Sequence, residues 1–251
     1  MDDNSVEFRK VPIRPVECLK EAKNQLGEQY WLFVGICAVG ILIGSLVPMG
    51  LLMGPMMCGI YLCFFKRSRG ETVTFELLFK GFDYFIESLI ASLIMVAAIT
   101  AVLIPMYLIM YVLIFAGMFA AGAAEGGGQG GDFAMAGFLG MMAFFYLVIF
   151  VAIIAVGTFF SFVYPLIVDR NMKAWPALKT SFSAVWANFG GMLGLVLLSQ
   201  LILGVAAMCC YLPALLVLPI TIGANKLAYF KVFPEAPEPE YESHTTELQP
   251  E

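Results

Sequence analysis

Few residues of this chain are suited to catalysis or to metal binding. His244 is the only histidine and lies in the acidic C-terminal tail, which excludes a histidine-based metal site or a Ser-His triad among the apolar segments. The glycine run at Glu125–Gly131 lacks the lysine that a phosphate-binding loop requires, so we interpret it as a linker. The residue types therefore predict a protein that is not an enzyme and that uses no cofactor and no metal.

Two polar side chains within or beside the apolar blocks are candidates for a binding role. An ionisable or amide group at membrane depth is a functional candidate by default. Glu87, however, lies one helical turn beyond Asp83 and could pair with Lys80 at the level of the lipid headgroups. Gln200, beside Ser199 near the middle of a long block, could contact a substrate or could form a hydrogen bond between helices. Both alternatives stay open for each residue.

Two clusters of basic residues follow apolar blocks directly. They could bind anionic lipid headgroups together with the amphipathic aromatic segments beside them, or they could serve only to orient the chain in the membrane. The six residues are Lys66, Arg67, Arg69, Arg170, Lys173 and Lys179.

The composition predicts an integral membrane protein. Hydrophobic residues make up 61% of the chain and charged residues only 13%, far from the balance of a globular domain. Four blocks, residues 29–65, 88–124, 133–168 and 180–225, contain no charge at all. Each is roughly twice the ~20 residues that cross a bilayer as a helix. The net charge is −5, so the chain lacks the excess of basic residues that would indicate a nucleic-acid partner.

The blocks predict an all-α fold, a polytopic membrane helix bundle with about six transmembrane helices over residues 29–230. Turns near residues 48–50 and 211–213 divide the first block into helices at 31–47 and 50–65, and the last into helices at 189–210 and 213–230. We interpret each middle block as one long helix, the first with a kink or break at Pro105. A hairpin is the alternative, because each helix would be ~55 Å long and the bilayer core is ~30 Å thick.

Three segments have the apolar periodicity of amphipathic helices at the cytoplasmic interface. The first, 15–27, belongs to an N-terminal segment, 1–28, whose first fourteen residues are expected to be loose, and residues 231–251 are expected to form a disordered acidic tail rich in Pro and Glu. The predicted apolar faces are Leu19, Ala22 and Leu26 in the first segment, Phe75, Leu78, Phe79 and Phe82 in 73–83, and Trp175, Leu178, Phe182 and Val185 in 174–188.

The distribution of positive charge predicts the orientation. With six helices, all fourteen Lys and Arg residues lie on one side, which the positive-inside rule assigns to the cytoplasm, so both termini are inside. Residues 61–90 and 164–193 share one order of elements and suggest a parallel internal repeat, which common topology alone could also produce. Small-residue pairs such as Gly40 and Gly44 fit packing within one bundle or a homodimer.

Short motifs occur at 59–61, 69–71, 79–82, 164–170 and 177–181 with Asn188. They resemble motifs of uncharacterised bacterial inner-membrane families, including the membrane domain sometimes fused to glycerophosphoryl diester phosphodiesterases. The resemblance covers about residues 55–230. It implies about six helices with amphipathic cytoplasmic elements and a bacterial inner-membrane location, and it implies no activity.

The sequence leaves two functions open. The first is a non-enzymatic membrane protein that organises lipids or a protein partner at the cytoplasmic face, where homo-oligomers are also possible. The alternative is a carrier or channel-like transporter of a small molecule or lipid, with a path near Gln200, Thr100 and Pro105. A transporter requires a polar cavity at mid-depth, and a scaffold requires a dry bundle with a belt of basic and aromatic residues.

Overall fold

The computed structural model describes residues 7–46, 51–123, 130–209 and 211–234. These residues form helices and connecting segments without a strand, which confirms the all-α prediction for the described part. The elements are α1 Pro15–Leu26, η1 Gly27–Gln29, α2 Tyr30–Leu46, α3 Met53–Ser68, η3 Phe75–Tyr84, α4 Phe85–Ala123, α5 Gly130–Phe160, α6 Val163–Arg170, α7 Ala174–Ala187, α8 Phe189–Cys209 and α9 Tyr211–Val232.

Five helical segments of the described chain are long and apolar enough to cross a membrane, as expected of a membrane-embedded protein. The helix expected at 50–65 corresponds to α3, which has 16 residues and is therefore only ~24 Å long, shorter than the bilayer core. The five segments are Pro15–Leu46, Phe75–Phe119, Gly137–Arg170, Phe189–Met208 and Leu212–Val232.

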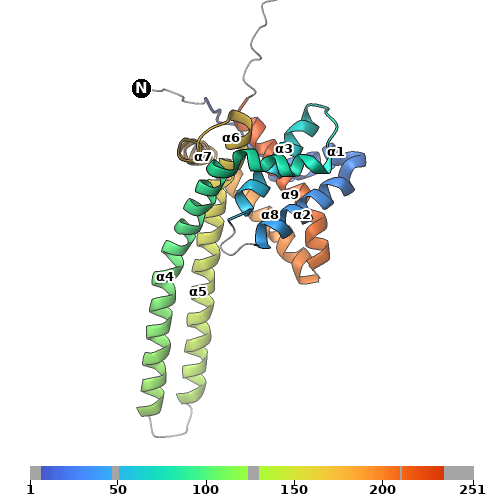
Figure 1. Ribbon diagram of the computed structural model, residues 1–251. Helices are drawn as coiled ribbons and strands as arrows, with labels where there is room; N and C mark the ends of the chain where they lie inside the picture. Colours follow the sequence, from blue (N-terminus) through green and yellow to red (C-terminus); the bar gives the residue numbers. More distant parts are fainter. Residues whose placement is uncertain (1–6, 47–50, 124–129, 210, 235–251) are drawn as a thin grey trace, which may run out of the picture.

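The two middle blocks form long helices, not hairpins of short ones. α4 runs for 39 residues without a break at Pro105, and α5 runs beside it, so that the pair projects far beyond the other helices (Figure 1). The second block is not one helix, however. Ser161 and Phe162 form a turn after α5, and the chain then continues as the short, buried helix α6. Part of the glycine-rich linker, 124–129, lies outside the described residues, as does the C-terminal tail beyond Pro234.

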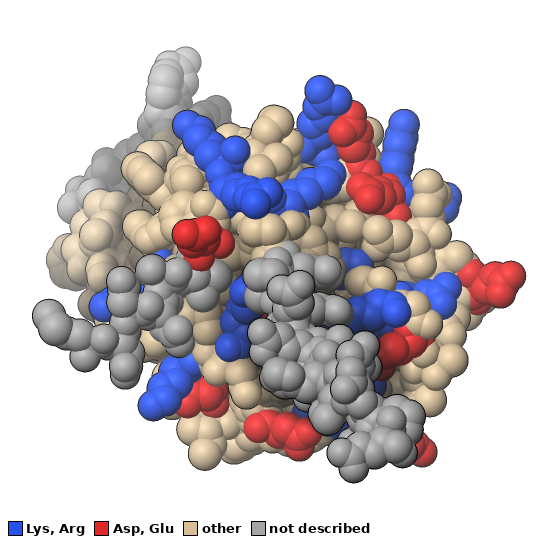
Figure 2. All heavy atoms as spheres, turned by 90° about the horizontal axis from the view of Figure 1, so that it is seen from above, with Lys and Arg blue, Asp and Glu red and all other residues tan. Residues whose placement is uncertain are grey.

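Charged side chains gather at the end of the molecule opposite the tip of the α4–α5 pair. Figure 2, seen from this end, shows Lys and Arg interspersed with Asp and Glu. Ion pairs connect segments that are distant in sequence: Arg69 approaches Asp169 at 3.6 Å, and Lys231 approaches Glu21 at 3.7 Å. We call this end the charged face. It carries the ends of α1, α3 and α9 and the segments 66–83 and 169–179.

The N-terminal segment is held against the helices. The backbone N–H of Arg9 donates to the carbonyl of Val232 at 2.8 Å, and that of Val11 donates to Asn188 Oδ1 at 2.9 Å. The expectation that residues 1–14 are loose is therefore wrong for residues 7–14. The apolar face of α1 includes Leu19 and Ala22, as predicted, but it is buried against α9 and α8 and is not available to lipid.

Buried side chains of α1, α2, α3, α6, α7 and α9 form the core, and η3 packs closely on α3. Gly59 of α3 and Gly81 of η3 meet so closely that a Cβ atom on Gly59 would overlap the carbonyl oxygen of Leu78. Gly40 and Gly44 of α2 likewise lie against Ile60 and Met53. The small-residue spacing at 40–44 therefore serves packing within this chain.

Candidate functional site

α7 presents its aromatic side chains outward. Its buried face consists of small residues and Val185, whereas Trp175, Phe182 and Trp186 are 57%, 50% and 65% exposed. Rings of Phe159, Phe182 and Trp186 stack on one another along this surface. The predicted face was therefore wrong in part, because Val185 points into the protein and the aromatic residues point away from it.

η3 likewise has buried residues on one side and exposed aromatic residues on the other. Leu78 is fully buried against α3, while Phe75, Phe79 and Phe82 remain 37%, 45% and 38% exposed. The 3₁₀ conformation has 3.0 residues per turn instead of 3.6, which places Leu78 on one face with the buried Gly81 and places Phe79 on another face with Phe82. Phe75 is exposed at the first residue of the element. Both amphipathic elements thus leave aromatic rings uncovered by the described chain.

An apolar groove of about 570 Å³ runs between α4, α5 and α7. Its walls include Ile94, Val156 and Leu178, and Lys179 is the only charged residue of its lining. The Lys179 ammonium lies 5.5 Å from the ring centroid of Trp175, a cation–π distance. The groove therefore combines a long apolar wall with one cation.

The six predicted basic residues divide into paired and unpaired groups. Lys66 pairs with Glu71 at 2.9 Å, Arg69 and Arg170 both approach Asp169, and Arg170 also donates to the carbonyl of Pro234. Arg67, Lys173 and Lys179 have no acidic partner within 4.0 Å in the described part of the chain. The unpaired cations of α7 and its N-terminal boundary lie next to the outward aromatic rings.

Glu87 has a different role from those predicted. Its Oε2 accepts a hydrogen bond of 2.7 Å from the backbone N–H of Ala174, the first residue of α7. A carboxylate at a helix N-terminus satisfies an unpaired donor and complements the helix dipole. No contact with Lys80 accompanies it among the described residues. Glu87 therefore positions the aromatic helix.

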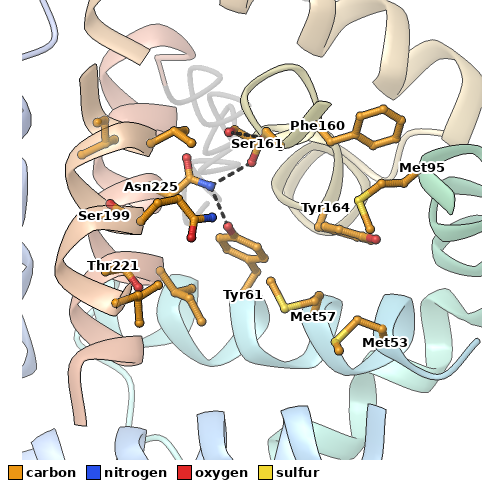
Figure 3. Close-up of a pocket in the computed structure, with 16 residues that line it drawn as sticks. Met53, Met57, Tyr61, Met95, Phe160, Ser161, Tyr164, Ser199, Thr221 and Asn225 are labelled. Atoms are coloured by element: carbon orange, nitrogen blue, oxygen red, sulfur yellow. Dashed lines mark hydrogen bonds between the residues drawn. The ribbon is translucent and has the colours of Figure 1, made fainter. Parts of the chain in front are cut away.

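A second cavity, of about 310 Å³, lies among α3, α4, α5, α6, α8 and α9 (Figure 3). Gln200 lines it, together with Ser199 and Thr221, so the structure brings the predicted mid-depth amide to a cavity. Thr100 and Pro105, the other residues of the predicted path, are not part of the lining.

The polar end of this cavity was not foreseen from the sequence. Asn225 Nδ2 donates to the hydroxyl of Tyr61 at 2.9 Å and to the carbonyl of Ser161 at 3.1 Å (Figure 3). Nearby, the hydroxyls of Tyr164 and Ser92 lie 3.1 Å apart. Asn225 ends the last uncharged block, and this position beside Lys226 was the only signal available in the sequence.

Comparisons with known proteins add no relative: no family model, no curated protein and no solved structure matches this chain.

Proposed function

We propose that this chain is a non-enzymatic integral membrane protein that binds and organises anionic lipids at the cytoplasmic face of a bacterial inner membrane. In this proposal six helices, α3 included, span or enter the bilayer, both termini are cytoplasmic, and the charged face is the cytoplasmic end. η3 and α7 lie at the interface, with their aromatic rings among the lipids.

The groove between α4, α5 and α7 is the observation that carries this proposal. An acyl chain fits its apolar walls, and Lys179 at its margin attracts a phosphate or another anionic headgroup. The outward Trp175 and Trp186 support it, because exposed aromatic rings with a polar edge favour the headgroup level. Lys173 and Lys179 are free to contact lipid, since neither has an acidic partner within 4.0 Å in the described structure.

Quenching of tryptophan fluorescence by brominated lipids tests this proposal. In a Trp31→Phe background only the two α7 tryptophans report. We expect brominated phosphatidylglycerol to quench them at a lower mole fraction than brominated phosphatidylcholine does. Because a basic residue near a membrane surface contributes about 1 kcal/mol, Lys173→Gln combined with Lys179→Gln should reduce this preference about tenfold or more.

The matched control is Lys20→Gln with Lys23→Gln on α1, which removes the same charge from the charged face at a distance from α7. The preference should survive in this control. Two outcomes would contradict a lipid site at α7. One is equal quenching by the two lipids in the protein with both α7 lysines intact. The other is an equal loss of the preference for brominated phosphatidylglycerol in both double variants, which would leave only a general attraction to anionic surfaces.

A second candidate function, carriage of a small molecule or lipid, is favoured by one observation. Gln200 lies near the middle of α8 and lines the second cavity, where a transporter needs a polar group. Flux through liposomes containing the Gln200→Leu variant separates this function from lipid organisation, which should not depend on Gln200.

A further inference from the structure

We propose that the cavity between α3, α8 and α9 binds an uncharged amphiphile that carries a hydroxyl headgroup, such as a monoacylglycerol or a long-chain alcohol. The site is separate from the α7 groove, and its occupancy does not depend on the function proposed for the charged face.

The lining determines the class of ligand. None of the sixteen residues that line the cavity is charged. A charged headgroup would therefore lose its hydration without gaining a counter-ion, at a large cost in free energy. Polar uncharged groups are nevertheless present at several points, among them Ser199, Gln200 and Thr221. An uncharged ligand with hydrogen-bonding capacity suits this combination.

The lining around Tyr61 and Asn225 is polar, and the lining toward Met53 on α3 is apolar. Tyr61 and Asn225 lie toward the ends of α3 and α9 that reach the charged face, and Ser161 is in the turn after α5. Met53, eight residues before Tyr61 on α3, lies ~12 Å deeper along that helix. Leu203 is likewise on the deeper part of α8. A bound amphiphile would place its headgroup near Tyr61 and its chain along Met53.

Beside Tyr61, one donor and one acceptor are unused among the described residues. The Tyr61 hydroxyl accepts from Asn225 but donates to no acceptor there, although Tyr61 is only 3% exposed. Asn225 Oδ1 is buried and accepts no hydrogen bond. Buried polar groups are nearly always paired. A ligand hydroxyl can accept from the Tyr61 O–H, whereas a hydrocarbon leaves this donor unpaired.

The volume of the cavity suits a small ligand. Cavities that hold small molecules measure about 300–1,000 Å³, and this one, at about 310 Å³, accepts a headgroup and part of a chain. Gln200 is exposed at its margin, so the cavity communicates with the surroundings of α8. The rest of an acyl chain could extend there into the bilayer.

Photolabelling of the full-length protein in liposomes tests the inference. The probe is a monoacylglycerol with a diazirine in its acyl chain, and labelled peptides are identified by mass spectrometry. We expect saturable labelling of peptides from α3 and α8, competed by unlabelled monoolein and not by lysophosphatidic acid of the same chain length. Tyr61→Phe removes the free donor and should weaken binding about tenfold. Tyr30→Phe is the matched control, because the Tyr30 hydroxyl bonds to the carbonyl of Leu216 outside the cavity.

If Tyr61→Phe does not fold, a second pair of variants tests whether the probe binds in the cavity. Ser199→Phe fills the cavity and should abolish saturable labelling, whereas Leu201→Phe, on the same helix but outside the lining, should leave it intact. Labelling that is equally strong for both variants, or that lysophosphatidic acid competes as well as monoolein does, would overturn the inference. Saturable labelling without flux of the same probe would support the binding site and remove the carrier function.

Discussion

At the level of single residues, buried polar groups connect elements of this protein that the sequence separates widely. Lys226, 3% exposed on α9, donates to Gln25 of α1 at 2.8 Å and to Ser68 of α3 at 2.7 Å. Tyr229 donates to Asp169 at 2.8 Å. Because buried polar groups are nearly always paired, these contacts hold the helix ends of the charged face in one arrangement.

Glu87 provides a test at this scale. Replacement by Ala removes the acceptor for the N–H of Ala174, and we expect the free energy of unfolding to fall by about 1 kcal/mol, as for loss of a helix N-cap. Glu87→Gln keeps an acceptor and should lose less. The measurement is thermal unfolding in detergent, with the exposed Glu76→Ala as control. A loss for Glu76→Ala as large as that for Glu87→Ala would contradict the capping role.

The site residues differ in how far the sequence reveals them. Gln200 was recognisable because an amide in a long uncharged block stands out. Tyr61 and Asn225 were not, because a tyrosine near a block end and an asparagine beside a lysine both have ordinary interfacial uses. Their role depends on α3 and α9 approaching each other, and a contact between residues 164 positions apart leaves no local pattern.

At the level of elements, the contact of η3 with α3 depends on glycine. A Cβ on Gly59 would overlap backbone atoms of Leu78, and one on Gly81 would overlap Pro55 and Gly59. Backbone atoms cannot rotate away as a side chain can, so the two elements would have to separate.

Gly59→Ala should therefore destabilise the protein by about 2 kcal/mol or more, despite the higher helix propensity of alanine. Gly35→Ala in α2 is the matched control, because nothing lies within 4 Å of the added Cβ; it should be neutral or stabilising by up to about 1 kcal/mol. Both are measured by thermal unfolding in the same detergent. Equal unfolding temperatures for the two variants would exclude close backbone contact at Gly59.

Helix positions were more predictable than the faces those helices bury. The turn predicted near 48–50 lies outside the described residues, between α2, which ends at Leu46, and α3, which begins at Met53. The turn predicted at 211–213 was misplaced, because these residues already belong to α9, which begins at Tyr211. In both cases the signal was a set of turn residues in an otherwise uniform apolar block. The turn at Ser161 and Phe162 carries no such signal, and neither does the burial of small residues under α7. The order of elements in α3–η3–α4 parallels that in α6–α7–α8, but one amphipathic element is 3₁₀ and the other α-helical, so a true duplication remains a prediction.

At the level of the whole molecule, the charge distribution concerns one end of the protein, and the helix lengths concern how far each helix reaches across a bilayer. The apolar blocks predicted a membrane protein whose basic residues meet at one end, and the ion pairs of the charged face agree with this. The lengths are unequal, however. α8 has 21 residues and α4 has 39, which correspond to ~31 Å and ~58 Å. Only the shorter helix matches a bilayer core of ~30 Å.

The α4–α5 pair should therefore extend past the far side of the membrane, since α4 starts and α5 ends near the charged face. Phe119 is 34 residues beyond the start of α4, or ~51 Å along its axis, which exceeds the ~45 Å of a bilayer with its headgroups. We expect Phe119→Cys to react with a membrane-impermeant maleimide added outside intact cells and Leu108→Cys to remain protected. Both native side chains are exposed in the structure, at 86% and 60%, so protein packing does not account for a difference between them.

Cysteines placed on the charged face complete this labelling experiment. Arg69→Cys should react only after the membrane is permeabilised, because the proposed orientation retains the basic residues on the cytoplasmic side. The wild-type signal is subtracted, and Cys18, Cys37, Cys58 and Cys63 are buried. Labelling of Arg69→Cys from outside would invert the orientation. Protection of Phe119→Cys would mean that the pair tilts until its whole apolar length lies within the lipid, which requires α4 and α5 to lean away from α8 and α9 more than they do in Figure 1.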